Sequence, residues 1–394
     1  MDFDRVIVRR GTDCAKWDTF DKIYGGTDLI HVGCADMDFQ SPPEICEELK
    51  QAVEHGVFGY TDLSDKFYSG ICSWYHSRHQ IEVKPEEIIF TPRINIACGL
   101  CIEALTRPGD KVILNAPAYP PLCQAAEDNG RTVIETPLKA SGDSFELDLE
   151  ALEKEVDDKT HFMVLVNPHN PTTRCWTLTE LQAVADFCVR HDLYLFCDEI
   201  HGDFVKQGCT FHSILECSGP IRERLIVASS PAKTFNVMGC LVAYLIIRNP
   251  KLKAAFYREI QRVGEHNPSL FANAVMRVAY QQCAWYVDEV NAYIDGNEAY
   301  IRQEFMRLFP KLEIKRREGT YLLWMDFNPV FESEKDMMAY FIDEARVEIY
   351  PGSHFGRAFS GYVRFNLAEA RPLLEEIVRR MEAALKRGPA GLKA

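Results

Sequence analysis

The chain has 394 residues, of which 47% are hydrophobic and 26% charged, a composition typical of a folded globular protein and not of a disordered one. Its length suffices for two domains. With 44 basic and 58 acidic side chains the formal net charge is −14 and no Lys/Arg-rich block stands out, so we expect no nucleic-acid binding.

The N-terminus and the cysteines predict a cytoplasmic protein. The first residues are acidic where a signal peptide needs a basic start, and no apolar run is long enough to span a bilayer. The fourteen cysteines are scattered singly, as expected of buried, reduced thiols. The one Cys-x-x-Cys, at 98–101, lacks the second half of a zinc site, so we predict core packing there and no metal.

Through the middle of the chain, short β-rich runs alternate with helical patterns such as Leu178–Arg190. The predicted strands are Ile88–Phe90, Lys111–Leu114, Phe162–Val166, Leu193–Cys197, Leu225–Ala228 and Leu241–Ile247. This alternation predicts an α/β fold with a mostly parallel sheet between two layers of helices.

After about residue 250 the pattern changes to charged amphipathic helices with short strands near Tyr321–Trp324 and Tyr362–Phe365. This change indicates a second, smaller α+β domain. The last segment, Lys386–Lys393, contains two glycines and a proline, and we predict a frayed tail.

Polar side chains follow the predicted strands at the points where the strands end. Asn170 lies after Phe162–Val166, Asp198 directly after Leu193–Cys197, and Lys233 shortly after Leu225–Ala228. The segment after Ile88–Phe90 opens a helix. Because ligands of open parallel sheets lie beyond the carboxyl ends of the strands, these groups are expected to meet. A lysine, a carboxylate, an amide and a helix N-terminus together suit pyridoxal 5′-phosphate (PLP).

Each of these residues alone has a simpler interpretation. Asp198 could cap the following helix, and Asn170 could form an Asx turn before a proline. Lys233 could be a surface lysine, and His201 a structural histidine. Their order along the chain and their common placement at strand ends favour the functional interpretation.

Several segments resemble fold-type I PLP enzymes of the aspartate aminotransferase superfamily, and within it the cystathionine β-lyase/cysteine C–S lyase branch. The matching segments span nearly the whole chain: ADMDF at 35–39, FGYT at 58–61, PAYP at 117–120, NPHNP at 167–171, DEIH at 198–201, KTFN at 233–236, PGSHFG at 351–356 and VRFNLA at 363–368. The DEIH and KTFN segments are fairly specific to this branch.

The resemblance implies roles around the cofactor ring. Lys233 would form the Schiff base and act as the base at Cα, while Asp198 would pair with the pyridine nitrogen. Asn170 would donate to the ring oxygen, with His201 nearby. Tyr119 would stack on the ring and belong to the catalytic set, although a core aromatic after a strand is the alternative for it.

The resemblance also implies contacts at the two ends of the site. The phosphate would lie against Ile94, Asn95 and Ser230 and be reached by Tyr60 of a neighbouring subunit, which implies a homodimer. An amino-acid substrate would contact Arg364, Asp36, Gly33 and Asn170, with Arg364 on its α-carboxylate. Arg364 alone would more simply be a surface charge.

For the fold, the resemblance implies a seven-stranded sheet in a large domain and a small domain shared by the two ends of the chain. We place the N-terminal arm at 1–45, the PLP-binding domain at 46–285 and the small domain at 286–394.

Three positions depart from the pattern of the branch. Gly33 stands where the lyases usually carry a tryptophan, which would enlarge or reshape the substrate region. Arg93 stands where the phosphate turn usually has a glycine, which lets the backbone approach closely. Ala232, before the lysine, replaces a Ser or Thr that binds phosphate, and Ser230 is expected to bind the phosphate in its place.

We therefore predict a PLP-dependent β-lyase that converts cystathionine, cystine or another cysteine S-conjugate into a thiol, pyruvate and ammonia. The alternatives are an aminotransferase on the same site, a specialised-pathway enzyme for an unusual conjugate, and a regulatory protein that contacts a transcription factor. A nucleotide-binding α/β enzyme is disfavoured because the chain has neither a Gly-x-Gly-x-x-Gly nor a Walker-type loop.

Overall fold

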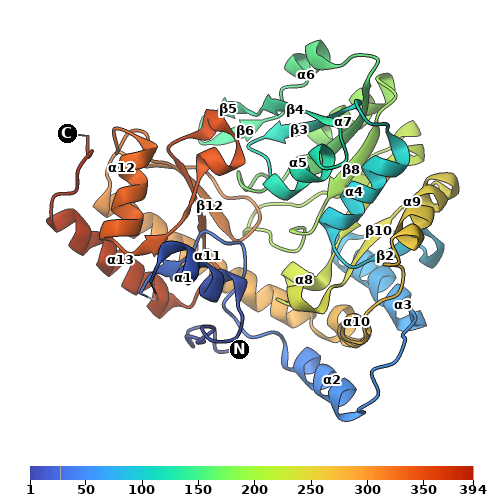
Figure 1. Ribbon diagram of the computed structural model, residues 1–394, viewed down its shortest axis with the longest axis horizontal. Coiled ribbons are helices and arrows are strands. Elements are labelled where there is room, and N and C mark those ends of the chain that lie inside the picture. Colours follow the sequence, from blue (N-terminus) through green and yellow to red (C-terminus); the bar gives the residue numbers. More distant parts are fainter. Residues whose placement is uncertain (27, 394) are drawn as a thin grey trace.

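The computed structural model describes residues 1–26 and 28–393. Figure 1 shows a larger part built on a broad sheet and a smaller part formed by the C-terminal elements, with the N-terminal segment lying against the smaller part. The division predicted at residues 45 and 285 stays a prediction.

The broad sheet has seven strands in the order β2-β10-β9-β8-β7-β3-β4. Their bounds are β2 Ile88–Thr91, β10 Ala243–Ile246, β9 Leu225–Ser229, β8 Tyr194–Asp198, β7 Thr160–Val166, β3 Lys111–Ala116 and β4 Thr132–Pro137. Only β10 is antiparallel to its neighbours, so the predicted mostly parallel sheet is confirmed. The sequence patterns missed β4, a half-exposed edge strand without the continuous apolar run of a buried strand.

Two helical layers cover the sheet because successive side chains of a strand point to opposite faces. On β7, Phe162 and Val164 pack toward one layer, whereas Met163 and Leu165 pack toward the other. The first layer contains α4 Ile94–Leu105, α5 Pro120–Glu127 and α9 Pro250–Arg262; the second contains α3 Asp65–Trp74, α7 Leu178–Arg190 and α10 Leu270–Gln282. Helix α7 has the predicted bounds.

The smaller part has its own antiparallel sheet, in the order β11-β12-β15-β14. These strands are Glu313–Ile314, Leu322–Asp326, Tyr362–Asn366 and Tyr350–Pro351, and they pack with α11 Ala284–Leu308, α12 Glu334–Ala339 and α13 Arg371–Lys386. The N-terminal strand β1 Ile30–His31 pairs with β13 Val347–Glu348, so both ends of the chain build this part, as predicted.

The remaining elements are short or peripheral. They are α1 Phe20–Tyr24, α2 Pro43–Glu54, α6 Leu149–Glu155, α8 Pro231–Thr234 and the hairpin of β5 Lys139–Ser141 with β6 Ser144–Glu146. Among the described residues, none of the helices combines the length and the apolar character needed to cross a membrane.

The prediction of a frayed tail after Lys386 is wrong. The backbone N–H of Lys393 donates to the carbonyl of Val330 at 2.9 Å, and that of Glu332 donates to Gly391 at 2.8 Å. The glycines therefore let the chain turn back onto the smaller part instead of releasing it.

Candidate active site

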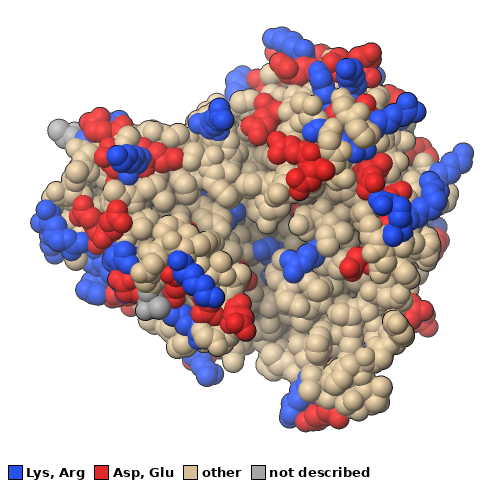
Figure 2. Space-filling view, viewed as in Figure 1, with Lys and Arg blue, Asp and Glu red and all other residues tan. Residues whose placement is uncertain are grey.

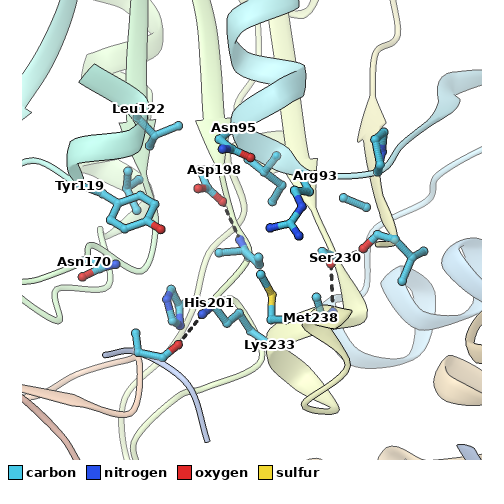
Figure 3. Close-up of a pocket in the computed structure, with 18 residues that line it drawn as sticks. Arg93, Asn95, Tyr119, Leu122, Asn170, Asp198, His201, Ser230, Lys233 and Met238 are labelled. Atoms are coloured by element: carbon cyan, nitrogen blue, oxygen red, sulfur yellow. Dashed lines mark hydrogen bonds between the residues drawn. The ribbon is translucent and has the colours of Figure 1, made fainter. Parts of the chain in front are cut away.

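A pocket lies at the carboxyl ends of β7, β8 and β9, beside the N-terminus of α4 (Figure 3). The strand ends deliver the predicted side chains because β8 stops at Asp198 and β9 stops four residues before Lys233. All predicted cofactor residues except Tyr60 line this one pocket: Lys233, Asp198, Asn170, His201, Tyr119, Ile94, Asn95 and Ser230.

The amine of Lys233 lies in this pocket and donates a hydrogen bond to the carbonyl oxygen of Ala35. Tyr321 donates its hydroxyl to the same carbonyl at 3.0 Å. Burial lowers the pKa of the Lys233 ammonium, with the charge of Asp36 acting in the opposite direction. A neutral amine, the form that attacks carbonyls and accepts protons, is thus more accessible here than on an exposed lysine.

The carboxylate of Asp198 is buried in the pocket and has no cationic hydrogen-bond partner among the described residues. Its Oδ1 accepts the backbone N–H of Ile200 at 3.1 Å. Burial raises the pKa of Asp198 to about 6, against the lowering effects of that hydrogen bond and of the Lys233 charge. A cationic N–H donor placed opposite this carboxylate would relieve its desolvation.

His201 and Asn170 carry polar groups that the protein leaves unused. His201 is 2% exposed, and its Nδ1 has no hydrogen-bond partner among the described residues. Burial, with the charges of Lys233 and Arg364, lowers its pKa well below the usual value, so the ring is neutral. Asn170 turns its oxygen toward Arg364, which leaves its amide donors for a ligand. An aromatic ring with a protonated nitrogen and an acceptor oxygen fits these groups.

The guanidinium of Arg364, on β15, is buried beside the pocket. It donates to the carbonyl of Gly33 at 2.7 and 3.2 Å and to Oδ1 of Asn170 at 3.1 Å. Its carbon lies 4.9 Å from the ring centre of Tyr350 and 4.7 Å from that of Phe355. Within the described chain it has no carboxylate partner, an arrangement that suits an anionic ligand.

The remaining predicted residues lie outside the pocket. Asp36 pairs with Arg9 at 2.7 Å, and its backbone carbonyl accepts from Lys16. The side chain of Tyr60 is fully exposed. Their predicted roles in substrate binding and across a subunit interface stay predictions.

The space for a side chain at Gly33 is occupied by neighbouring residues. A Cβ atom there would lie 2.5 Å from Cδ1 of Tyr350, 2.6 Å from Oε1 of Glu348 and 2.7 Å from the backbone nitrogen of Tyr350. The space that a side chain would need is therefore already filled by β13 and β14. The sequence patterns of these two strands did not indicate this role.

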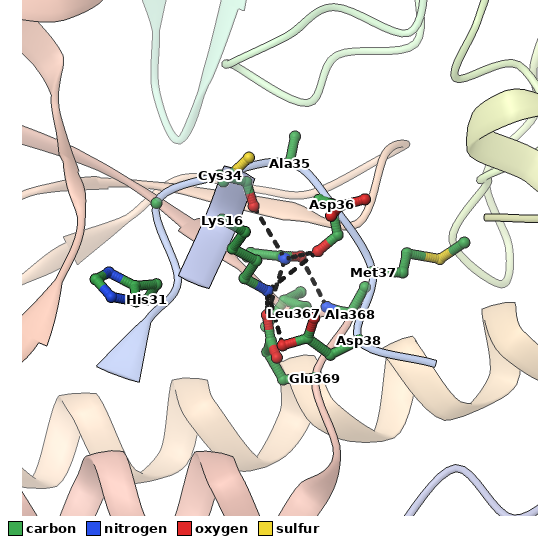
Figure 4. A network of polar contacts seen from close by, with 12 residues as sticks. Lys16, His31, Cys34, Ala35, Asp36, Met37, Asp38, Leu367, Ala368 and Glu369 are labelled. Atoms are coloured by element: carbon green, nitrogen blue, oxygen red, sulfur yellow. Dashed lines mark hydrogen bonds and ion pairs between the residues drawn. The ribbon is translucent and has the colours of Figure 1, made fainter. Parts of the chain in front are cut away.

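A buried polar network that the sequence patterns did not indicate holds the segment 34–38 next to the site (Figure 4). Lys16 is 1% exposed and contacts Asp38 at 3.1 Å, the carbonyl of Asp36, and Glu369. Asn366 donates to the carbonyls of Cys34 and Asp36 at 3.1 and 2.9 Å. These bonds fix the backbone that presents the Ala35 carbonyl to Lys233.

Comparison with known proteins places this architecture in a family. The model of the aminotransferase class I and II family matches residues 27–381, so the chain belongs to that family. It is 32% identical to cystathionine beta-lyase PatB of Bacillus subtilis (strain 168), covering 98% of this chain and 100% of PatB. It is also 32% identical to the protein MalY of Escherichia coli (strain K12), covering 98% and 99%. The crystal structure of cystalysin from Treponema denticola, which contains a pyridoxal 5′-phosphate cofactor, matches with a TM-score of 0.93 at 30% identity, covering 98% of this chain and 99% of cystalysin.

Replacing Gly33 with alanine is expected to destabilise the protein by about 1–3 kcal/mol, because the new methyl group overpacks against Tyr350 and Glu348. Urea unfolding measures the loss. Gly296→Ala is the matched control. Gly296 lies inside α11, and a Cβ atom there would lie 3.7 Å from the nearest atom, so we expect the free energy of unfolding to stay the same or rise slightly. Equal stability of Gly33→Ala and wild type would show that the filled space yields easily.

Asp198→Asn is expected to stabilise the cofactor-free protein at pH 8 by about 3 kcal/mol, since a folded-state pKa of about 6, against the ordinary 3.8 of an aspartate, penalises the charged form in the fold. The penalty is full above pH 6 and fades as the pH falls toward 4, so the gain must shrink with it. Thermal unfolding between pH 4.5 and 8 measures this trend, with the exposed Asp158→Asn as control. A gain that does not depend on pH contradicts the assignment.

Proposed function

We propose that the protein is a PLP-dependent carbon–sulfur β-lyase that cleaves cystathionine, cystine or another cysteine S-conjugate. The observation that carries the proposal is the buried Lys233 amine in one pocket with the Asp198 carboxylate, beside a guanidinium, Arg364, that lacks a carboxylate partner. The relatives named cystathionine beta-lyase and the cystalysin structure with its cofactor support the choice of PLP and of C–S cleavage.

The unused groups of the pocket define how the cofactor would be held. Asp198 would receive the pyridine N–H, which needs a buried acceptor and relieves the desolvated carboxylate. The amide of Asn170 would donate to the ring oxygen next to His201, and Tyr119 would lie against the ring. Lys233 would bond to the aldehyde carbon. The phosphate would lie at the N-terminus of α4, where N–H groups have no partner within the helix.

The chain's own groups then perform the reaction on an S-conjugate. Arg364 binds the α-carboxylate, with its fork already oriented by Gly33 and Asn170. The amine of Lys233 would accept the Cα proton. Bound PLP supplies an electron sink for the electrons left at Cα. The thiolate leaves from Cβ, and one water molecule completes the conversion to pyruvate and ammonia. Proton transfer by such a positioned base contributes about 10²–10⁴-fold.

An aminotransferase is the second candidate, because the chain belongs to the aminotransferase class I and II family. That reaction would use the same lysine. The two reactions differ in the fate of the Cα electrons: the lyase expels a thiolate from Cβ, whereas the aminotransferase returns a proton to the cofactor side. The products, pyruvate for the lyase and glutamate for the aminotransferase, therefore distinguish the two activities.

The purified protein is loaded with PLP and given cystathionine or cystine, and the pyruvate formed is measured. In a parallel assay it is given an amino acid and 2-oxoglutarate, and the glutamate formed is measured. We expect pyruvate to form much faster than glutamate. Lys233→Ala is expected to lower turnover at least about a hundredfold and to abolish the near-visible absorbance band, whereas the exposed Lys22→Ala keeps both. Glutamate formation without pyruvate would favour the aminotransferase, and wild-type turnover in Lys233→Ala would exclude the mechanism.

We propose in addition a homodimer in which Tyr60 reaches the phosphate of the neighbouring site. Val57, Phe58 and Tyr60 are 64%, 63% and 105% exposed in the single chain, an unusual concentration of apolar surface on one loop. Light scattering is expected to give about 90 kDa, twice 45.0 kDa. Tyr60→Phe should keep the dimer and weaken PLP binding about tenfold through loss of one hydrogen bond to a charged group. A monomer, or unchanged PLP affinity, contradicts this role.

The proposed location is the cytoplasm. All fourteen cysteines, each of them described in the structure, are free thiols, as expected where disulfides do not form. Fractionation of the source cells with detection by antibody tests the location.

A further inference from the structure

Arg93 occupies the N-cap position of α4 and lines the same pocket as Lys233 and Asp198. Its backbone is extended, and Figure 3 shows its guanidinium directed into the pocket from the α4 end. In the space-filling view, basic side chains appear inside the hollow between the two parts, although acids outnumber bases in the whole chain (Figure 2).

The guanidinium of Arg93 forms no ion pair and donates no hydrogen bond within the described part of the chain. Two buried arginines elsewhere in the chain do have acidic partners: Arg317 contacts Glu298 at 2.7 Å, and Arg174 contacts Glu318 at 2.9 Å. Because a guanidinium cannot shed its proton, a free one that points into a cavity favours an anion there.

The backbone next to Arg93 adds donors for the same anion. The first bond within the helix runs from the N–H of Ala97 to the carbonyl of Arg93 at 3.1 Å, so the N–H groups of residues 94–96 have no acceptor in the helix. The side chain of its N-cap residue, Arg93, makes no capping hydrogen bond to this twelve-residue helix. The positive end of its dipole therefore coincides with the free guanidinium.

The hydroxyl expected to bind the phosphate is already engaged. Ser230 donates its proton to the carbonyl of Val242 at 2.5 Å and accepts the N–H of Ala232 at 2.9 Å, so it caps α8. Ala232 has no polar side chain. The pocket thus lacks a free hydroxyl donor at these two positions and has a free cation at Arg93.

We infer that Arg93 binds the phosphate of PLP and replaces the hydroxyl contact that is missing at Ala232. Two N–H groups of its fork would meet two phosphate oxygens, while the amides of Ile94 and Asn95 complete the cradle. The inference rests on the proposed cofactor orientation, with the phosphate toward α4.

A cofactor that lacks the phosphate separates this role from any other role of Arg93. The cofactor-free wild type, Arg93→Gln and Arg93→Lys are titrated with PLP and with pyridoxal, and the absorbance of the lysine-bound form gives each dissociation constant. The control is Arg222→Gln, an exposed arginine on the short helical turn before β9, at the opposite end of that strand from Ser230, and outside the pocket. Inorganic phosphate is the second probe, read out as the rise in the thermal midpoint of the cofactor-free protein.

Arg93→Gln is expected to bind PLP about ten- to a hundredfold more weakly, the range for a lost charge-assisted hydrogen bond, with pyridoxal affinity unchanged. Arg93→Lys should lose less, because it keeps the charge but not the fork. Phosphate should raise the midpoint of the wild type and of Arg222→Gln but not that of Arg93→Gln.

Three results overturn the inference. If Arg93→Gln binds PLP as tightly as the wild type, Arg93 does not contact the phosphate. If it loses affinity for PLP and for pyridoxal equally, Arg93 does not act on the phosphate. A raised KM for the S-conjugate at unchanged PLP affinity assigns Arg93 to the substrate. Failure of the wild type itself to form the lysine-bound absorbance band, by contrast, rejects the proposed function together with this inference.

Discussion

The arrangement of the site depends on an ammonium group with almost no access to solvent. Lys16 lies between Asp38 and Glu369, residues from opposite ends of the chain. Burial opposes its charge, but Asp38 and Glu369 outweigh burial and raise the pKa of Lys16. Burial and the nearby Asp38 raise the pKa of Glu369, whereas the Lys16 ammonium opposes that rise. With Arg9 on Asp36 and Asp38, two cations face three carboxyl groups, and each carboxyl group has a cationic partner, the condition under which buried charge is tolerated.

The segment that this cluster anchors supplies carbonyl oxygens to both sides of the site. Ala35 accepts from Lys233, and Gly33 accepts from Arg364. The anchoring cluster is therefore nearly satisfied within the protein, whereas the pocket keeps an uncompensated carboxylate, an unpaired imidazole nitrogen and guanidinium groups without acids. This contrast identifies the pocket as the place where a ligand completes the structure.

The sequence predicts those parts of the site that follow from local patterns. Continuous apolar runs locate β7, β8 and β9, and their carboxyl ends bring Asn170, Asp198 and Lys233 together. Contacts between distant segments leave no such pattern. Lys16 meets Glu369 across 353 positions, and Ser230 gives its proton to a carbonyl twelve residues away. The half-exposed strand β4 is not predicted for the opposite reason, because its local hydrophobic pattern is too weak.

The filled space beside Gly33 also constrains how this site can change. A side chain at position 33 collides with Tyr350 and Glu348, including a backbone atom that no substitution at 350 can remove. A single codon change to a larger residue at 33 therefore meets a steric barrier, and removing it requires the β14 backbone to move as well as the side chains at 348 and 350 to change. Positions 33, 348 and 350 pack against one another, so we expect substitutions at them to be non-additive: the cost of a larger residue at 33 depends on which residues already occupy β13 and β14.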